Sequence, residues 1–427
     1  MRERASVIPG LQKFAVIQEE ITLILSRMVG YCQWLLPLQR LAVCNLAEIR
    51  YNFQINIYAK ETLQMTESST GLYRSIHAQP DAMRRLLADW DGPAQAAEKL
   101  SSAGRVLLSG IGTSYHAAIV GEYLLRLAGA DAWALRSFEF VNYPRPLRPD
   151  DGIIIVSHRG SKLHGNLAAQ RAAEAKVLTI GITGKNSKMQ GPDIVLETVE
   201  QDPSATHSIS YTGALARLGQ IASRLAAQLG NAEQARRLEQ GLQQIPSLME
   251  DILARENEVR TIAREAASHQ RRLYYVGAGP NAATATEGAL KAKEASYVTA
   301  EGFELEQAIH GPQVAFEMED LLIPIVVKEA ALARMADFLL ASSEICSRVW
   351  LIGVAPNADA AALFNREGWS RFAICDDVDV PEELTPLLAA LPVQLLSEFL
   401  AAARGTNADS FRADQEAYKK MGTHFSI

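Results

Sequence analysis

Leu273-Tyr-Tyr-Val-Gly-Ala-Gly-Pro280, followed by Glu287-Gly-Ala-Leu-Lys291-Ala-Lys-Glu294, predicts a buried strand, a glycine turn and then a helix. Glu287, Lys291 and Glu294 are spaced i, i+4 and i+7, so their side chains share one helix face. With His310 shortly after, in His310-Gly311-Pro312, these are groups that general acid–base catalysis uses. On spacing alone, a solvent-facing helix with Glu–Lys pairs explains the same residues, and His310 is then an ordinary loop histidine.

The same strand–turn–helix pattern occurs in both halves of the chain. Apolar strands alternating with helices predict a parallel sheet covered by helices on both faces. The fold class expected is therefore α/β, with two tandem copies of one unit. Strands are expected at 105–109, 132–136, 152–157, 177–182, 193–196, 273–276, 321–327, 349–353 and 372–374.

The first 64 residues do not match the rest, because their helical periodicity is patchy and their caps are poor. We expect the working protein to start near Met65, with 1–64 an appendage; the alternative is a helical extension used in oligomer contacts. The expected organisation is an atypical N-terminal extension at 1–64, a helical lead-in at 65–100, a first domain with linking helices at 101–268, and a second domain with a C-terminal tail at 269–427.

Composition excludes several classes of protein. A formal net charge of −7 argues against nucleic-acid binding, which usually needs a basic surface. The four cysteines are scattered without a CxxC pair, which argues against structural zinc and suits a reducing cytoplasm. The apolar run 28–39 is too short to span a bilayer, and no signal peptide is evident, so we expect a cytoplasmic protein without membrane contact.

Polar loops follow two expected strands of the first unit. Gly112, Thr113 and Ser114 lie in a glycine turn before a helix, a place that suits a phosphate. Ser157-His158-Arg159-Gly160-Ser161-Lys162 occupies the equivalent place one strand later, where open α/β sheets bind ligands. A third polar cluster, 204–212, precedes a long expected helix and includes Ser208; its hydroxyls can bind the hydroxyls of a sugar. The structural alternatives are helix caps for the hydroxyls and solvated surface charges for Arg159 and Lys162.

Taken together, these segments resemble the SIS (sugar isomerase) family from about residue 70 to the C-terminus. Among its members they resemble the isomerase half of glutamine:fructose-6-phosphate aminotransferase and hexosamine-6-phosphate deaminases. The matching motifs are 112–115, 157–162, 208–212, Glu287–Glu294, Ala300-Glu301 and His310-Gly311-Pro312, of which the last three are specific in order and spacing.

The resemblance implies two sugar-isomerase domains, usually in a homodimer with shared active sites. It implies a phosphosugar held by the loops 112–114 and 157–162. Glu294 matches the base that moves a proton between C1 and C2, and His310 matches the group that opens the sugar ring, commonly supplied by the partner subunit. Glu287 and Lys291 match supporting residues, and no metal or other cofactor is expected.

Departures from the family narrow the expected reaction. Arg159 and Lys162 replace neutral or acidic groups, which indicates a more exposed or additional anionic group on the ligand. The tail has no lysine in the matching place, and 1–64 is too short for a glutaminase domain, so glutamine-derived ammonia is not expected. We expect a hexosamine-phosphate isomerase or deaminase. The alternatives are a sugar-phosphate sensor that binds without catalysis and a deglycase of phosphorylated sugar–amine adducts.

Overall fold

The computed structural model describes residues 70–424 except 270–271, 328, 347, 354–368 and 375–379. Internal contacts divide the chain into two units, Met1–Met65 and Thr66–Ile427. The first unit lies outside the described residues, and so does the extension expected at 1–64. The domain boundaries given above therefore stay predictions.

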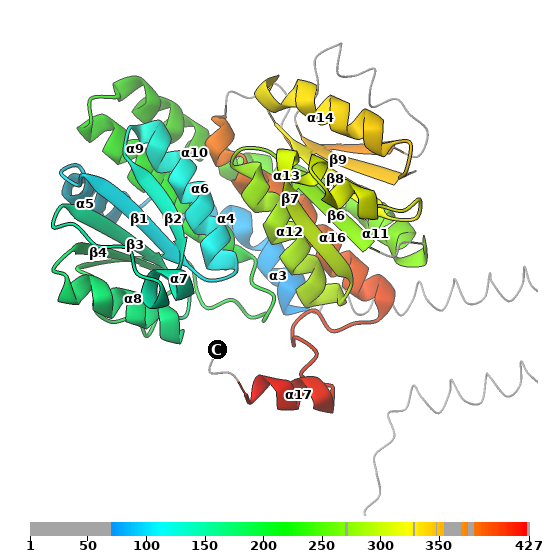
Figure 1. Ribbon diagram of the computed structural model, residues 1–427, viewed down its shortest axis with the longest axis horizontal. Coiled ribbons are helices and arrows are strands. Elements are labelled where there is room, and N and C mark those ends of the chain that lie inside the picture. The colour runs from blue at the N-terminus through cyan, green and yellow to red at the C-terminus, as the bar shows by residue number, and fades with distance from the viewer. Residues whose placement is uncertain are drawn as a thin grey trace, which may run out of the picture. The chain divides into compact units, whose positions relative to one another are not determined.

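The second unit contains two five-stranded sheets whose neighbouring strands all run parallel (Figure 1). Their orders are β2-β1-β3-β4-β5 and β10-β9-β8-β6-β7, so the second sheet repeats the first strand by strand. This confirms the predicted α/β class with two parallel sheets. The strands are β1 (Arg105–Gly110), β2 (Ala132–Arg136), β3 (Asp151–Val156), β4 (Leu178–Thr183), β5 (Ile194–Glu197), β6 (Arg272–Gly277), β7 (Thr299–Glu304), β8 (Leu321–Val326), β9 (Arg348–Gly353) and β10 (Trp369–Ala373).

Helices precede, cover and link the two sheets. Those before the first sheet are α3 (Gly71–His77), α4 (Gln79–Leu87) and α5 (Asp91–Leu100), and those among its strands are α6 (Thr113–Ala128), α7 (Ser137–Asn142) and α8 (Leu163–Glu174). The linking helices are α9 (Ile209–Gln228), α10 (Ala232–Ala254) and α11 (Glu256–His269). The second half carries α12 (Asn281–Ser296), α13 (Leu305–Ile309), α14 (Glu329–Ser342), α16 (Pro386–Arg404) and α17 (Glu416–Gly422).

The sequence analysis missed the edge strand β7 and the short helices α7 and α13. β7 has the sequence Thr-Ala-Glu-Gly-Phe-Glu, and only Ala300 in it is buried. An edge strand pairs on one side only, so it lacks the continuous apolar run that identified the inner strands. Polar residues and a glycine then hide the strand from pattern analysis.

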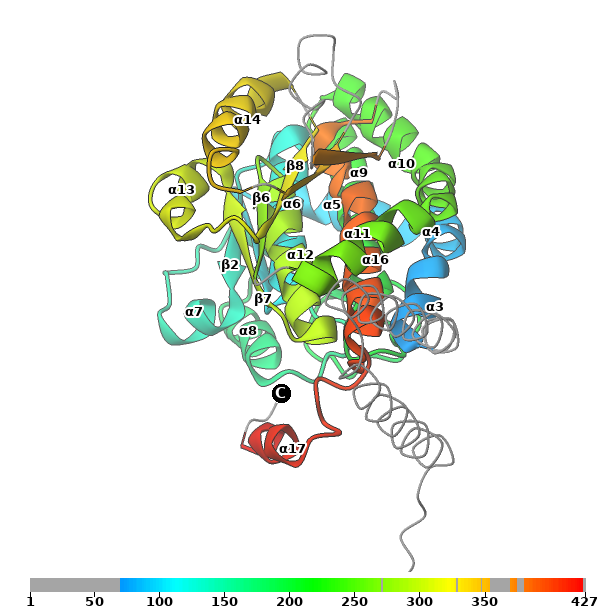
Figure 2. The same cartoon turned by 90° about the vertical axis from the view of Figure 1, so that its right-hand side faces the viewer.

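Each sheet buries both faces, and the inner faces share one core. In β1 and β3, Leu107, Ile153 and Ile155 pack under α8, while Val106 and Leu108 point to the opposite face. That opposite face belongs to a single cluster that also contains residues of α6, α9, α12 and α16 and of the second sheet. Figure 2 shows α12 and α16 side by side, and the two helices are in contact. The two halves are therefore packed together through these helices.

Glycine permits the same tight turn after β1 and after β6. A Cβ on Gly110 would lie 2.3 Å from the Ser114 carbonyl oxygen, and one on Gly277 would lie 2.2 Å from the Asn281 carbonyl oxygen. Both distances are too short for any side chain. Two residues later in each turn comes a glycine with positive φ, which L-residues with a side chain rarely adopt. The turns predicted from the sequence thus bring each helix directly against its strand.

The most apolar helical segment lies in this core. Among the described residues, Glu382–Arg404 alone is long and apolar enough to cross a membrane by length and composition, and 89% of its apolar window is buried inside the protein. It has the properties of a core helix.

One carboxyl in this core helix gives the fold a pH dependence. Glu398 is 1% exposed; it accepts a hydrogen bond from the Thr70 hydroxyl at 2.7 Å, and its Oε2 has no partner among the described residues. Burial raises the pKa of Glu398 from 4.5 to about 7; Asp409 adds to this rise, while Thr70 and Arg260 oppose it.

We expect Glu398→Gln to stabilise the protein at pH 8 by about 3 kcal/mol and to change little at pH 4. A carboxyl whose folded-state pKa is raised contributes stability below its unfolded pKa and loses it as pH rises through the folded value. For Glu398 that window runs from 4.5 to about 7. Urea unfolding of both proteins at the two pH values measures the difference, and an equal response of both to pH would contradict it.

Candidate functional site

The loops after β1 and β3 lie next to each other because these two strands pair in the sheet. Both loops are at the carboxyl ends of parallel strands, and the strand order reverses at β1, which has β2 on one side and β3 on the other. This is where open α/β sheets bind ligands. Helix α12 of the second half packs on α6, the helix that the first loop begins (Figure 1). The site therefore draws its loops from one half and its carboxylates from the other.

Glu287, Lys291 and Glu294 form a connected cluster on α12. The Lys291 Nζ lies 2.5 Å from Glu294 Oε2 and 3.5 Å from Glu287 Oε1. Glu287 is 0% exposed and Lys291 is 1% exposed, whereas the Glu294 side chain keeps 20% exposure. The alternative of a solvent-facing helix is therefore wrong for the first two residues, because α12 is enclosed by α6, α16 and β7. Only Glu294 is open to a ligand.

The two carboxyls of this cluster differ in their pKa. Burial raises the pKa of Glu287, but the Lys291 ammonium and hydrogen bonds from His116 and Thr113 outweigh it and hold this pKa below its usual value. Burial also raises the pKa of Glu294, and here Lys291 does not fully offset it, so the value is above the ordinary one. The pKa of Lys291 is raised, because the two carboxylates outweigh the effect of its burial. Glu287 is thus a fixed anion and Glu294 a proton acceptor with increased basicity.

Two residues of α6 hold Glu287 in place. His116 Nδ1 lies 2.6 Å from Glu287 Oε2, and the Thr113 hydroxyl donates to Oε1 at 3.1 Å. Sequence analysis missed His116, although it lies one turn after Thr113 on the same helix face. The Thr113 hydroxyl was predicted to bind phosphate; in the structure it contacts the carboxylate. Gly112 supplies the left-handed turn before α6, with φ +55°; contacts of Gly112, Thr113 and Ser114 with phosphate stay predictions.

The loop 157–162 faces α12 with two cations. Arg159 is exposed and Lys162 is half-buried. Burial, with Arg159 and Lys291 nearby, lowers the pKa of Lys162, and the charge of Glu294 acts against this. Ser157 is buried, while Ser161 is exposed. Arg159 and Lys162 offer two positive charges beside a cluster whose own lysine is already paired, which suits a phosphate dianion.

His158 and the segment 202–212 complete this side of the site. The Asp202 carboxylate accepts hydrogen bonds from the Ser75 hydroxyl at 2.8 Å and from the Ser208 backbone N–H at 2.8 Å. The Asp202 N–H donates to His158 Nε2 at 3.2 Å. The His158 ring meets the His207 ring edge-on, with centroids 5.7 Å apart. The Ser208 hydroxyl is buried and has no partner among the described residues.

The structure places His310 away from these groups within one chain. It follows α13, its side chain is 72% exposed, and its Nε2 lies 3.3 Å from Glu306 Oε2. Glu306 also pairs with Arg334 at 2.6 Å. Within the described part of the chain, no hydrogen bond or ion pair joins His310 to the cluster on α12.

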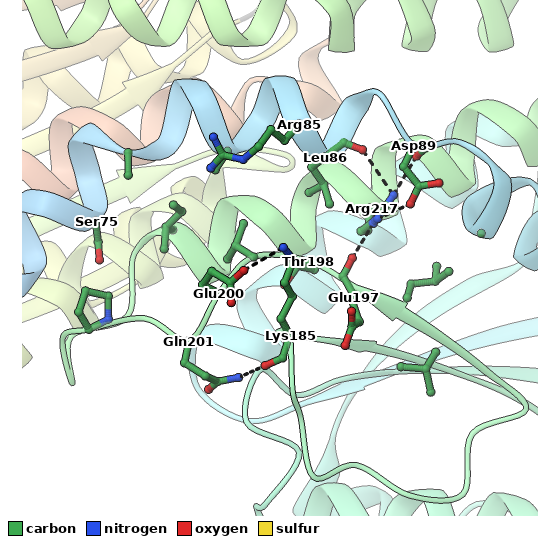
Figure 3. Close-up of a pocket in the computed structure, with 18 of the residues that line it drawn as sticks. Ser75, Arg85, Leu86, Asp89, Lys185, Glu197, Thr198, Glu200, Gln201 and Arg217 are labelled. Carbon is green, nitrogen blue, oxygen red and sulfur yellow. Dashed lines mark hydrogen bonds and ion pairs between the residues drawn. The ribbon is translucent and has the colours of Figure 1, made fainter.

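A cavity of about 660 Å³ lies elsewhere on the first half, between α4 and the end of β5 (Figure 3). Two ion pairs lie in its lining: Arg217 binds Asp89 at 2.8 Å, and Lys185 binds Glu200 at 2.9 Å. None of the predicted site residues lines it. Among residues 70–424, gaps excluded, no group of three or more His, Cys, Asp or Glu side chains is arranged to hold a metal ion.

Comparison with known proteins gives matches in both sequence and fold. The SIS domain model matches residues 99–218. A glutamine–fructose-6-phosphate aminotransferase of Gloeobacter violaceus is 30% identical over 80% of this chain, and the match covers 57% of that enzyme. The chain thus spans a little over half the length of this curated relative.

Two solved structures share the fold. The C-terminal domain of glucosamine-fructose-6-phosphate aminotransferase from Francisella tularensis superposes with a TM-score of 0.72 at 19% identity, covering 80% of this chain and 98% of that one. Glucosamine-6-phosphate deaminase from Thermotoga maritima gives 0.62 at 19% identity, covering 80% and 97%. At 19% identity, these two structures show a shared fold only. Homology is shown by the sequence match. The chain thus contains an SIS domain at residues 99–218 and is homologous to part of these aminotransferases.

Proposed function

We propose that this chain is an enzyme that moves a proton between C1 and C2 of a hexosamine 6-phosphate and releases ammonia without hydrolysing glutamine. The proposal rests on one observation, the difference in exposure and pKa among the three charged side chains on α12. Glu287 and Lys291 are buried and fixed, while Glu294 is partly exposed beside the cationic loop and has a raised pKa. A single accessible carboxylate of increased basicity is what transfer of a proton between adjacent carbons needs.

The residues suggest the following sequence of steps. The open-chain aldose phosphate lies with its phosphate on Arg159 and Lys162 and its C2 hydrogen toward Glu294. Glu294 removes that proton, the C1 oxygen takes one from a water molecule, and an enolamine forms; the proton set free when the iminium group is later hydrolysed restores that water. Glu294 returns its proton to C1, which leaves an iminium group at C2, and water hydrolyses this to the ketose and ammonia. The overall change is aldosamine phosphate plus water to ketose phosphate plus ammonia.

A substrate panel tests this proposal directly. Ammonia release and sugar products are measured with glucosamine, galactosamine and fructosamine 6-phosphates, with and without glutamine. Turnover of one of them without glutamine supports the proposal. Binding by calorimetry without any turnover would support the sensor instead. A phosphorylated sugar–amino acid adduct belongs in the panel because exposed Arg159 can also meet a carboxylate, and turnover of that compound alone would support the deglycase.

We further propose a homodimer in which His310 acts at the partner's site. The support is its position: His310 is 72% exposed and paired only with Glu306 among the described residues, while its own cluster lacks a group to open the ring. Glu294→Gln and His310→Asn are each expected to be inactive alone. Unfolded together and refolded as a 1:1 mixture, they should recover about a quarter of the wild-type activity, since half of the dimers then hold one complete site.

The control for this complementation is a mixture of each variant with itself, refolded in the same way. If the mixed sample stays as inactive as the separate variants, His310 acts within its own chain or not at all.

A further inference from the structure

We propose that the His207 imidazole donates a hydrogen bond from Nε2 to the carbonyl oxygen of the open-chain sugar, and so polarises it while Glu294 moves the proton on the neighbouring carbon. This inference rests on the proposed function and adds a catalytic residue to it. From the sequence, His207 belongs to the polar cluster 204–212 and has no role of its own. In the structure it lies just before α9, next to His158 of the cationic loop.

The position of His207 is fixed by its neighbours. Its ring meets the His158 ring edge-on at 5.7 Å, and the following residue, Ser208, is tied by its backbone N–H to Asp202 at 2.8 Å. His158 in turn receives the Asp202 N–H at 3.2 Å. This turn therefore holds His207 firmly beside the loop 157–162, a preorganisation that a catalytic donor needs.

We assign to His207 the tautomer that carries its proton on Nε2, which its hydrogen bond with Ser210 permits. Its Nδ1 lies 3.3 Å from the Ser210 hydroxyl, which can donate to it. An imidazole that accepts at Nδ1 carries its proton on Nε2. Among the described residues, Nε2 has no hydrogen-bond partner. It is not fully buried either, so its N–H can meet a ligand.

The surrounding charge keeps the ring neutral. Burial, together with the charges of Lys291, His158, Arg159 and Lys162, lowers the pKa of His207 to about 3. A neutral imidazole is a weaker acid than an imidazolium, so it donates a hydrogen bond to an enediolate or enolamine oxygen without losing its proton. Lys291 is thus one of the charges that lower the pKa of His207, and it also pairs with Glu294 at 2.5 Å.

Two amide replacements separate this role from packing. In His207→Gln the side-chain amide can place an N–H near the position of Nε2, whereas in His207→Asn it reaches only the position of Nδ1. We expect H207N to lower kcat by about 10²-fold, as removal of one oxyanion donor does, with KM changed little. H207Q should recover to within about tenfold of wild type. His77→Asn serves as the matched control. His77 lies on α3, where it pairs with Glu256 at 3.0 Å.

A spectroscopic measurement keeps the test independent of turnover. In E294Q, the carbonyl stretch of bound open-chain glucose 6-phosphate, an aldose with its carbonyl at C1, is expected at lower frequency than in solution, and adding H207N should abolish that shift. An unshifted carbonyl in E294Q, or a shift that persists with H207N, overturns the proposal, as does an H207N enzyme as active as wild type.

Failure of the proposed function gives a different result. If the wild-type protein turns over none of the panel substrates but binds glucose 6-phosphate, the carbonyl shift and its loss in H207N still decide whether His207 contacts the carbonyl. If glucose 6-phosphate does not bind, the substrate class is wrong and the His207 proposal falls with it.

Discussion

We expect Glu294→Gln to lower turnover by about 10³-fold, while the affinity for the proposed phosphosugar substrate stays within about threefold of wild type. The expected loss follows from the removal of the one accessible carboxylate of the α12 cluster, whose side chain is 20% exposed. Glutamine has nearly the same shape and keeps a hydrogen-bond acceptor for Lys291, so the cationic loop that we propose to bind the phosphate is unchanged. Initial rates with the panel substrate that wild type turns over, together with calorimetric binding, measure both quantities.

The pH profile provides a second measurement of the same residue. Only ionised Glu294 accepts a proton, so kcat/KM of wild type should rise with pH through its raised pKa. The residual activity of E294Q should lack that rise. Glu319→Gln, which changes an exposed carboxyl of the second half, is the control and should behave as wild type. Unchanged turnover in E294Q would remove Glu294 from the role of proton carrier.

We expect Lys291→Met to destabilise the folded protein by about 3–5 kcal/mol, because it leaves buried carboxylates without their cation. Lys291 is 1% exposed and lies within 3.5 Å of Glu287 and 2.5 Å of Glu294. The matched control is Lys293→Met on the same helix: Lys293 is exposed, so its loss should change stability by at most about 0.5 kcal/mol. Urea unfolding of the three proteins at pH 7.5 gives the comparison.

Two further measurements identify the cause of this destabilisation. Without Lys291 the pKa of each buried carboxyl rises above its unfolded value, so the stability of the variant is largest at low pH and is lost as pH rises. Its deficit should therefore be smaller at pH 5 than at pH 8. Adding Glu287→Gln should recover part of the loss, since these neighbours are coupled. A K291M protein as stable as K293M would show that the ammonium is dispensable to the fold.

The sequence predicted most of the architecture because the inner strands are apolar on both sides. Two glycine turns and runs such as Leu273–Val276 located strand–helix units in each half, and the structure has them at β1–α6 and β6–α12. The edge strand β7 was missed because it is half-polar. The contact of His116 with Glu287 was also missed, since it joins two helices that are 171 residues apart in the chain.

The sequence by itself determined the types of residue that the site contains and the element that carries each. The spacing of Glu287, Lys291 and Glu294 placed them on one helix face, and the loops 112–114 and 157–162 lay after strands. Spacing did not decide whether that face meets water or protein, because burial depends on neighbours far along the chain.

Only the tertiary structure decided that question. It packs α12 against α6 and α16, so Glu287 and Lys291 lose their water and become a fixed ion pair, while Glu294 keeps an exposed edge. It also places His207 next to His158 of the cationic loop and leaves His310 outside the cluster. The physical reason is the dielectric environment. At a surface, the three side chains would keep pKa values close to their usual ones. In the folded protein, burial and neighbouring groups shift the pKa of each side chain to a different degree.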